Sequence, residues 1–162
     1  MGTEKQLLTQ LSSLRDSTIL IVGLGNTLKG DDAVGPLVIE QLQSQSISAD
    51  LIDAGTVPEN YIQTIIKKAP NNLIVIDAID FKAPTGTIQI FKPEEINSHV
   101  ISTHVLSPRL FVDMVCRDIK LDVYFIGVQP ARMQIGQPVS PEVDGAIQKL
   151  SQILTEAFPL RK

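Results

Sequence analysis

The sequence predicts an α/β fold: an open, mostly parallel sheet with helices on both faces. Short apolar runs rich in β-branched residues recur along the chain, as in strands that are buried on both faces. Segments with a helical spacing of apolar residues separate these runs. A serine or threonine shortly before a proline marks the start of three of the helical segments. Because strands and helices alternate, helices are expected to connect strands that run parallel to one another.

Five segments are predicted to be strands. Residues 19–22, 72–76 and 123–128 are compact apolar runs, and residues 49–53 are a shorter candidate. Residues 87–91 alternate apolar and polar side chains, which predicts an edge or hairpin strand.

Four apolar stripes with a spacing of three or four residues predict helices, within residues 34–42, 61–69, 106–115 and 143–154. Three leucines within residues 7–11 add a short N-terminal helix. Thr56 begins a segment that matches a capping box, and Ser107 and Ser140 each precede a proline suited to the first helical position. These signals place the helix starts between the predicted strands.

The composition indicates one soluble globular domain, residues 1–162, with 43% apolar and 20% charged residues. The net charge is −4 and no basic run is present, so nucleic acid and anionic membranes are poor partners. No apolar run is long enough to cross a bilayer. The single cysteine, Cys116, lies in an apolar pattern that predicts a buried, inert thiol. We therefore expect a cytoplasmic protein, monomeric or weakly oligomeric.

Acidic residues stand where ligands bind in such folds, beyond the carboxyl ends of the strands. Asp32 follows the glycine-rich turn at 23–26, and Asp77 ends the third strand along the chain. A carboxylate in such a place is costly to desolvate unless a cation or hydrogen-bond donors pair with it. Together with one imidazole, from His104 or His99, the two carboxylates would form an oxygen and nitrogen site that suits Zn²⁺, Ni²⁺, Mn²⁺ or Fe²⁺.

Simpler roles for these residues are open at this stage. Asp31 or Asp32 would serve as the N-cap of the helix that begins near Ala33. Asp77 would cap a turn at residues 79–80. A lone histidine is more often a core or surface residue than a metal ligand.

A dinucleotide site is a further alternative, because Gly23 and Gly25 follow a strand and Asp53 closes the next one. The pattern lacks its third glycine, since position 28 is Leu28, and the acids at 31–32 would repel the phosphates. Such a site is therefore the weaker hypothesis.

The sequence contains no nucleophile motif, neither G-x-S-x-G nor H-E-x-x-H, and Cys116 has no clear histidine partner. If the protein is a hydrolase, a metal ion must polarise the carbonyl or activate water.

Residues 23–35, GLGNTLKGDDAVG, resemble the signature G-x-G-N-x-L/M-x-x-D-D/E-x-x-G of the NiFe-hydrogenase maturation endopeptidases. Further segments resemble the family in the same order: 53–60, 75–78, 84–86, 102–104 and 125–130. The P-E-N, S-T-H and G-x-Q-P pieces are most similar to the branch that serves hydrogenase 3 of formate hydrogenlyase, the HycI type. The similarity spans roughly residues 18–155, so residues 1–16 form an N-terminal extension to which we assign no function.

The resemblance implies a three-layer αβα architecture with a twisted five-stranded sheet. It implies that Asp32, Asp77 and His104 are the metal-binding and catalytic residues, although many relatives carry Glu at the position of Asp32. The residues expected to contact the substrate lie in the same motifs: Gly25, Asn26, Asp31 and Thr56.

The implied activity is an endopeptidase, of the aspartic or metal type, that removes a C-terminal extension from the hydrogenase large-subunit precursor. Ni²⁺ is expected to arrive with the precursor, and Zn²⁺ or Cd²⁺ to replace it in crystals. A metal-bound hydroxide is the expected attacking group, with Asp32 or Asp77 as proton acceptor. The alternative function is a non-catalytic chaperone that binds the nickel-loaded large subunit.

Overall fold

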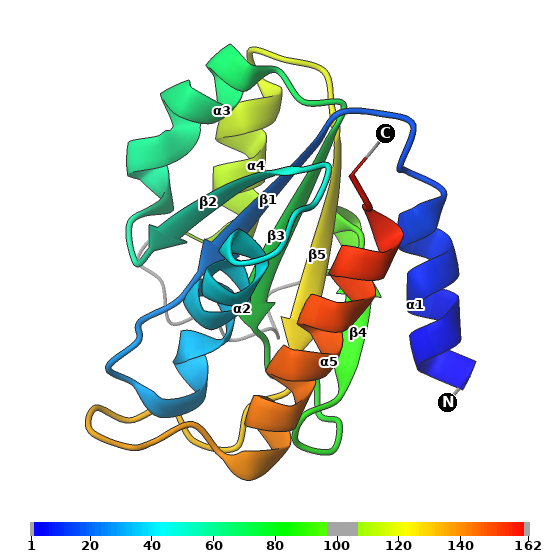
Figure 1. Cartoon of the computed structure of the whole chain (residues 1–162). Coiled ribbons are helices and arrows are strands. Elements are labelled where there is room, and N and C mark those ends of the chain that lie inside the picture. The colour runs from blue at the N-terminus through cyan, green and yellow to red at the C-terminus, as the bar shows by residue number, and fades with distance from the viewer. Residues whose placement is uncertain (1, 97–106, 161–162) are drawn as a thin grey trace.

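The computed structural model describes residues 2–96 and 107–160 (Figure 1). The strands are β1 (Ile19–Leu24), β2 (Asp50–Gly55), β3 (Asn72–Ala78), β4 (Ile88–Phe91) and β5 (Asp122–Val128). They form one sheet in the order β2-β1-β3-β5-β4. β1, β2, β3 and β5 run parallel, and β4 pairs antiparallel with β5 at one edge. The predicted mostly parallel sheet, with residues 87–91 at an edge, is confirmed.

Helices cover both faces of the sheet, which confirms the three-layer architecture (Figure 1). One face carries α1 (Gly2–Ser12), α2 (Val34–Gln43) and α5 (Pro141–Ala157). The other carries α3 (Ile62–Lys68) and α4 (Pro108–Cys116). Three short 3₁₀ turns complete the described structure: η1 (Gly30–Ala33), η2 (Pro58–Tyr61) and η3 (Pro93–Glu95). No helix in the described part of the chain is long and apolar enough to span a membrane.

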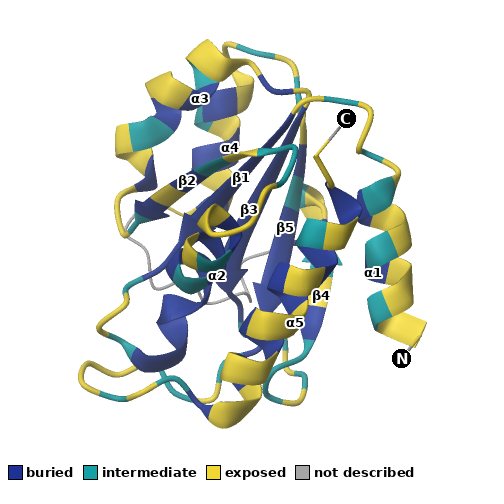
Figure 2. Ribbon diagram, in the orientation of Figure 1, coloured by how far each residue is buried: buried dark blue, intermediate teal, exposed yellow. Residues whose placement is uncertain are grey.

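Alternation along the central strands divides the core into two clusters. In β1, Ile19 and Ile21 pack beneath α1, α2 and α5, whereas Leu20 and Val22 pack toward α3 and α4. β3 and β5 divide their side chains in the same way. Figure 2 shows the result: the central strands are buried along their length, and the helices expose only their outer surfaces. This packing explains why these strands appear in the sequence as continuous apolar runs.

The N-terminal extension forms part of this core. Leu7 and Leu11 of α1 are buried in the same cluster as α5. Lys149 of α5 forms an ion pair with Glu4, 2.7 Å from Nζ to Oε1. Residues 2–12 therefore serve as a packing element for α5.

Two local expectations from the sequence are wrong. Thr56 does not cap a helix: the turn η2 has Val57 at its N-cap, without a side-chain cap hydrogen bond. Cys116 is exposed, because it lies on the outer side of α4. Phe111, Val112 and Val115 form the buried side of the helix. The predicted cap at Ser107 is confirmed, since its Oγ accepts the N–H of Leu110 at 3.1 Å.

Candidate active site

Asp31, Asp32 and Asp77 lie at the carboxyl edge of the sheet, the edge where the parallel strands end. β1 and β3 are neighbours in the sheet, and their last paired residues are Gly23 and Ile76. Beyond this pair, β1 continues into the glycine loop and η1, which lies against β3. The loop therefore returns to the end of β3.

Gly25 and Gly35 make this close approach possible. Gly25 has φ +144°, and a Cβ there would overlap the backbone oxygen of Asp32. A Cβ on Gly35 would lie 2.7 Å from the carbonyl oxygen of Ile76. Both glycines of the motif thus have a packing role, which brings η1 and the start of α2 against β1 and β3.

Asp32 lies in η1 with only 2% of its surface exposed. Its Oδ2 accepts the backbone N–H of Asn26 at 2.9 Å. The carboxylate thus closes the glycine loop from inside. The expectation that Asp32 caps the following helix is wrong, because the N-cap of α2 is Ala33, which has no side-chain cap hydrogen bond.

Asp77 is the penultimate residue of β3 and is also 2% exposed. Its strand partner in β5 is Gly127, a residue without a side chain. Asp77 lies within the strand, and the alternative that its side chain caps the turn at residues 79–80 stays open. The structure therefore places the carboxylates of Asp32 and Asp77 in neighbouring segments at one edge, as expected from the sequence.

Asp31, the neighbour of Asp32, has a different role. Its carboxylate is fully buried and accepts hydrogen bonds from the loop between β5 and α5. Oδ1 accepts the backbone N–H of Ser140 at 2.7 Å, and Oδ2 accepts those of Ala131 at 2.8 Å and Arg132 at 3.1 Å. The Ser140 hydroxyl adds a donor at 3.0 Å from Oδ1 and 2.8 Å from Oδ2.

These bonds determine the charge state of Asp31. Burial alone raises the pKa of the carboxyl, but the N–H groups of Ser140, Ala131 and Arg132 and the Ser140 hydroxyl outweigh it, so the pKa lies below its ordinary value. Asp31 is thus an ionised structural residue, fully buried, and it does not cap α2. Its expected contact with the substrate stays a prediction.

The remaining predicted contact residues lie on surface loops at the same edge. Asn26 is partly buried, and its Oδ1 accepts the N–H of Leu28 at 2.9 Å, which shapes the glycine loop. Thr56 is exposed directly after β2. The Gly25 N–H donates to the Gly55 carbonyl at 2.9 Å and joins these two loops. Gly25 itself is buried, so it supports the site from within.

The structure argues against a dinucleotide site. A phosphate cradle needs loop N–H groups that point to the ligand. Here the N–H groups of Gly25, Asn26, Leu28 and Lys29 all donate to acceptors within the protein. Asp53 forms a local turn instead, with its Oδ1 accepting the Gly55 N–H at 3.0 Å.

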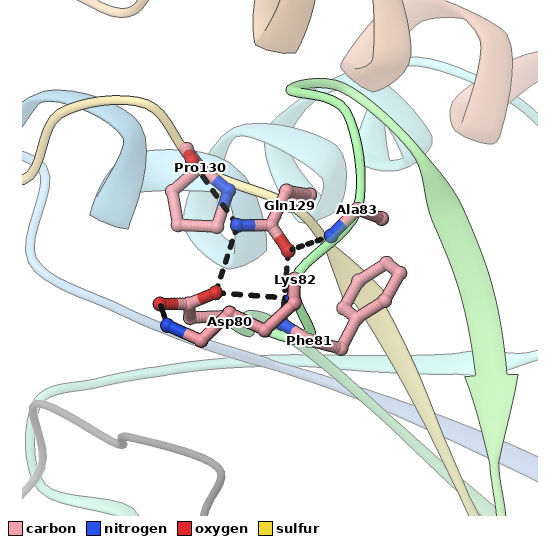
Figure 3. Close-up of polar contacts among 6 residues, drawn as sticks. All are labelled: Asp80, Phe81, Lys82, Ala83, Gln129 and Pro130. Atoms are coloured by element: carbon pink, nitrogen blue, oxygen red, sulfur yellow. Dashed lines mark hydrogen bonds and ion pairs between the residues drawn. The ribbon is translucent and has the colours of Figure 1, made fainter.

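Gln129 organises the loop that follows Asp77 (Figure 3). Its buried side-chain oxygen accepts the N–H of Phe81 at 2.8 Å and that of Ala83 at 3.2 Å. Its Nε2 donates to Asp80 Oδ1 at 3.1 Å and to the Pro130 carbonyl at 3.4 Å. The Gln129 amide is the first cause of the lowered pKa of Asp80, followed by the backbone N–H and the ammonium group of Lys82.

Reasoning from the sequence missed the roles of Gln129 and Ser140. Gln129 stands directly after the last residue of β5, in the same edge position as Asp77 after its apolar run, and this position was the available signal. Ser140 is the N-cap of α5 as predicted, but its hydroxyl binds Asp31 and makes no cap hydrogen bond. No local pattern signals that contact, since Asp31 is 109 residues away.

His104 and His99 lie outside the described residues. Within residues 2–96 and 107–160, no three His, Cys, Asp or Glu side chains form a group that could hold a metal ion. The set of Asp32, Asp77 and His104 therefore stays a prediction. The donor chemistry at the edge fits a divalent cation, because two carboxylates with 2% exposure supply hard oxygen ligands and negative charge.

Comparison with known proteins identifies relatives over nearly the whole chain. The model of the family described as hydrogenase maturation protease, HycI, matches residues 36–157. A Methanocaldococcus jannaschii relative is 31% identical over 162 residues, which cover 94% of each chain. The hydrogenase 3 maturation protease of Escherichia coli K12 is 30% identical over 139 residues, 85% of this chain and 88% of that protein. The HycI crystal structure from Thermococcus kodakarensis superposes with a TM-score of 0.83 at 26% identity, covering 92% of this chain and 97% of that one.

Proposed function

The chain belongs to the hydrogenase maturation protease family, and from this premise we propose that it removes the C-terminal extension of a NiFe-hydrogenase large-subunit precursor after nickel insertion. The observation that carries the proposal is the pair of buried carboxylates, Asp32 and Asp77, at one edge of the sheet. Buried carboxylates need hydrogen-bond donors or a cation to offset their desolvation, and a cationic partner suits a site that offers two oxygen ligands. A precursor that carries nickel would supply that partner.

In this proposal Ni²⁺ is part of the substrate. Asp32, Asp77 and His104 engage it, and Zn²⁺ or Cd²⁺ can replace it in crystals. A divalent ion at this place polarises the scissile carbonyl when the precursor is bound. Three protein ligands leave coordination positions for groups of the precursor.

The carboxylates also serve the proton transfers of peptide hydrolysis. Water adds to the scissile carbonyl carbon, and Asp32 or Asp77 accepts the proton that water loses. The same proton then passes to the amine of the departing peptide as the C–N bond breaks.

Exposed apolar side chains support a protein substrate at this edge. Leu28 is 68% exposed and Ile135 is 74% exposed, and the Gly136 N–H donates to the Leu28 carbonyl at 3.0 Å. Val57, on the loop after β2, is also exposed. Large apolar residues that remain in water next to a buried acidic pair are suited to contact a folded partner. Asn26 and Thr56 lie on the same loops and are proposed to contact the cleaved segment.

The direct test is to mix the purified protein with a nickel-loaded precursor and follow its mass. Loss of the C-terminal peptide supports the endopeptidase. A stable complex without cleavage would instead support a chaperone that binds the loaded subunit. The reaction is proposed to take place in the cytoplasm, and omission of nickel from the precursor is expected to prevent it.

Two variants test the assignment of residues. Asp77→Asn and His104→Ala are expected to keep the fold, as seen by circular dichroism, and to stop processing. Asp50→Asn is the matched control, because Asp50 is an exposed aspartate at the opposite edge of the sheet. If Asp77→Asn or His104→Ala cleaves at the wild-type rate, the assignment of that residue is wrong.

A further inference from the structure

The segment 129–140, which joins β5 to α5, contacts both acid-bearing parts of the site. We propose that this segment fixes the separation of Asp32 and Asp77, with Asp31 and Gln129 as positioning residues. The proposal rests on the function proposed above, because that activity gives Asp32 and Asp77 their roles. It adds two residues that need not touch the substrate.

The sheet alone leaves this separation undetermined. Backbone pairing between β1 and β3 ends at Gly23 and Ile76. Asp32 lies nine residues beyond Gly23, in η1, and Asp77 lies at the end of β3. Asp77 still pairs with Gly127 of β5, so the separation depends mainly on the contacts that place η1 and on those just beyond β3. Acid groups that act together need placement to within about 0.5 Å.

On one side, segment 129–140 holds η1 through Asp31. Three backbone N–H groups and one hydroxyl of the segment donate to this buried carboxylate. In return, the Asp31 N–H donates to the Arg132 carbonyl at 2.8 Å. Hydrogen bonds to a charged acceptor are shorter and stronger than neutral ones. Because Asp32 is the next residue, these bonds fix its backbone as well.

On the other side, the same segment holds the loop after Asp77 through Gln129 (Figure 3). The backbone of Gln129 makes two hydrogen bonds to this loop. Its N–H donates to the Thr87 carbonyl at 2.9 Å, and its carbonyl accepts the N–H of Gly86 at 2.8 Å. Its side-chain oxygen binds the N–H groups on either side of Lys82, which has φ +60°. A left-handed lysine is strained and persists only where its surroundings hold it. Gln129 thus imposes the path of the chain just beyond Asp77.

Kinetics separate positioning from simple stabilisation. Ser140→Ala removes one donor to Asp31 without removing a helix cap, and Gln129→Ala removes the acceptor for Phe81 and Ala83. Well below the melting temperature, each is expected to lower kcat for the loaded precursor about tenfold to a hundredfold, since misplacement by about 1 Å costs that much. KM is expected to stay within about twofold, because no substrate contact is lost.

Two control variants match these changes. Gln137→Ala lies in the same segment, and the Gln137 side chain accepts a local bond from the Gln134 N–H, at 3.0 Å. Asp53→Asn alters an exposed carboxylate at the same edge. Both are expected to keep the wild-type kcat. An unchanged kcat in Ser140→Ala and Gln129→Ala would overturn the proposal, and so would a raised KM with normal kcat.

Hydrogen exchange tests the proposal without any assay of activity. Because the Asn26 N–H donates to the Asp32 carboxylate, its exchange rate reports the position of Asp32. Gln129 makes no described hydrogen bond to Asn26. Gln129→Ala is expected to speed exchange of this amide about tenfold, because the loosened segment loosens η1. Unchanged exchange would overturn the positioning role. Failure of the wild type to cleave, with faster exchange in this variant, would instead count against the proposed function alone.

Discussion

The two edges of the sheet differ in the acidic residues that they bury, although Asp53 at the carboxyl edge is exposed. At the carboxyl edge, Asp31, Asp32 and Asp77 are almost completely buried. At the amino edge, Asp16 and Asp50 are exposed, and Asp50 forms a surface ion pair with Lys68, 3.5 Å apart. A cavity of about 500 Å³ lies at the amino edge, lined by these two acids and neighbouring polar residues. Its polar wall is a structural junction: Asn71 Oδ1 accepts from the backbone and the hydroxyl of Thr18.

The edge at which we propose that the reaction takes place is thus the one that buries carboxylates, whereas the cavity lies at the other edge. A hollow between surface loops costs the protein little. A buried carboxylate costs several kcal/mol unless donors or a cation compensate it, so its retention calls for a structural or chemical reason. At the carboxyl edge, donors of segment 129–140 compensate Asp31, and the Asn26 N–H contributes to Asp32. The proposed activity gives Asp32 and Asp77 a chemical role in addition to their contacts within the protein.

The largest expected effect is on turnover. Asp32→Asn is expected to lower kcat for the loaded precursor by about a hundredfold to ten-thousandfold, because it removes the proposed carboxylate ligand and proton acceptor. Asp32→Glu keeps a carboxylate on a longer side chain, and it is expected to retain part of the activity. The measurement is the rate of peptide release at saturating precursor. Equal rates for wild type and Asp32→Asn would contradict the proposal that the reaction takes place at the carboxyl edge.

The next effect is on stability. Asp31→Ala leaves the buried donors of Ser140 without an acceptor, so the free energy of unfolding is expected to fall by about 3 kcal/mol. Asp50→Ala at the amino edge loses only an exposed ion pair and is expected to change it by less than about 0.5 kcal/mol. Urea denaturation curves measure both. Similar losses in the two variants would contradict the contrast.

Acidic pH is expected to weaken the contribution of Asp31 to the free energy of unfolding. Its pKa in the folded protein lies below the ordinary value of 3.8, so the ionised form stabilises the fold above that pH. The stabilisation is lost as the pH falls from about 4 through the folded pKa. The difference in unfolding free energy between wild type and Asp31→Asn should therefore shrink on acidification. Asp80, whose pKa is also lowered, is present in both proteins and cancels in this difference.

The smallest effect is expected at Cys116. It is exposed at the end of α4, just before β5 begins, and so lies toward the amino edge. Partial burial and the nearby Asp113 raise the pKa of its thiol, which keeps it protonated and slow to react at neutral pH. Cys116→Ser is expected to leave kcat and KM unchanged. A marked loss would show that the amino edge takes part in the reaction.

Much of the fold could be predicted from the sequence because local patterns encode it. The apolar runs at 19–22, 72–76 and 123–128 became the three central strands, each one or two residues longer. The alternation at 87–91 marked the edge strand β4. The prediction that Cys116 is buried was wrong. The buried side of α4 is formed by Phe111, Val112 and Val115, and the next position along the helix, Cys116, faces outward.

The sequence by itself determined the fold class and the edge at which the acids lie, since periodicity sets the elements and parallel strands end together. Only the tertiary structure decided between the neighbours Asp31 and Asp32. Asp32 accepts a bond from Asn26, six residues away, whereas Asp31 is held by partners 100 to 109 residues away. A local pattern contains no information about such distant donors. Folding brings them together, and their geometry separates the structural carboxylate from the one proposed to act.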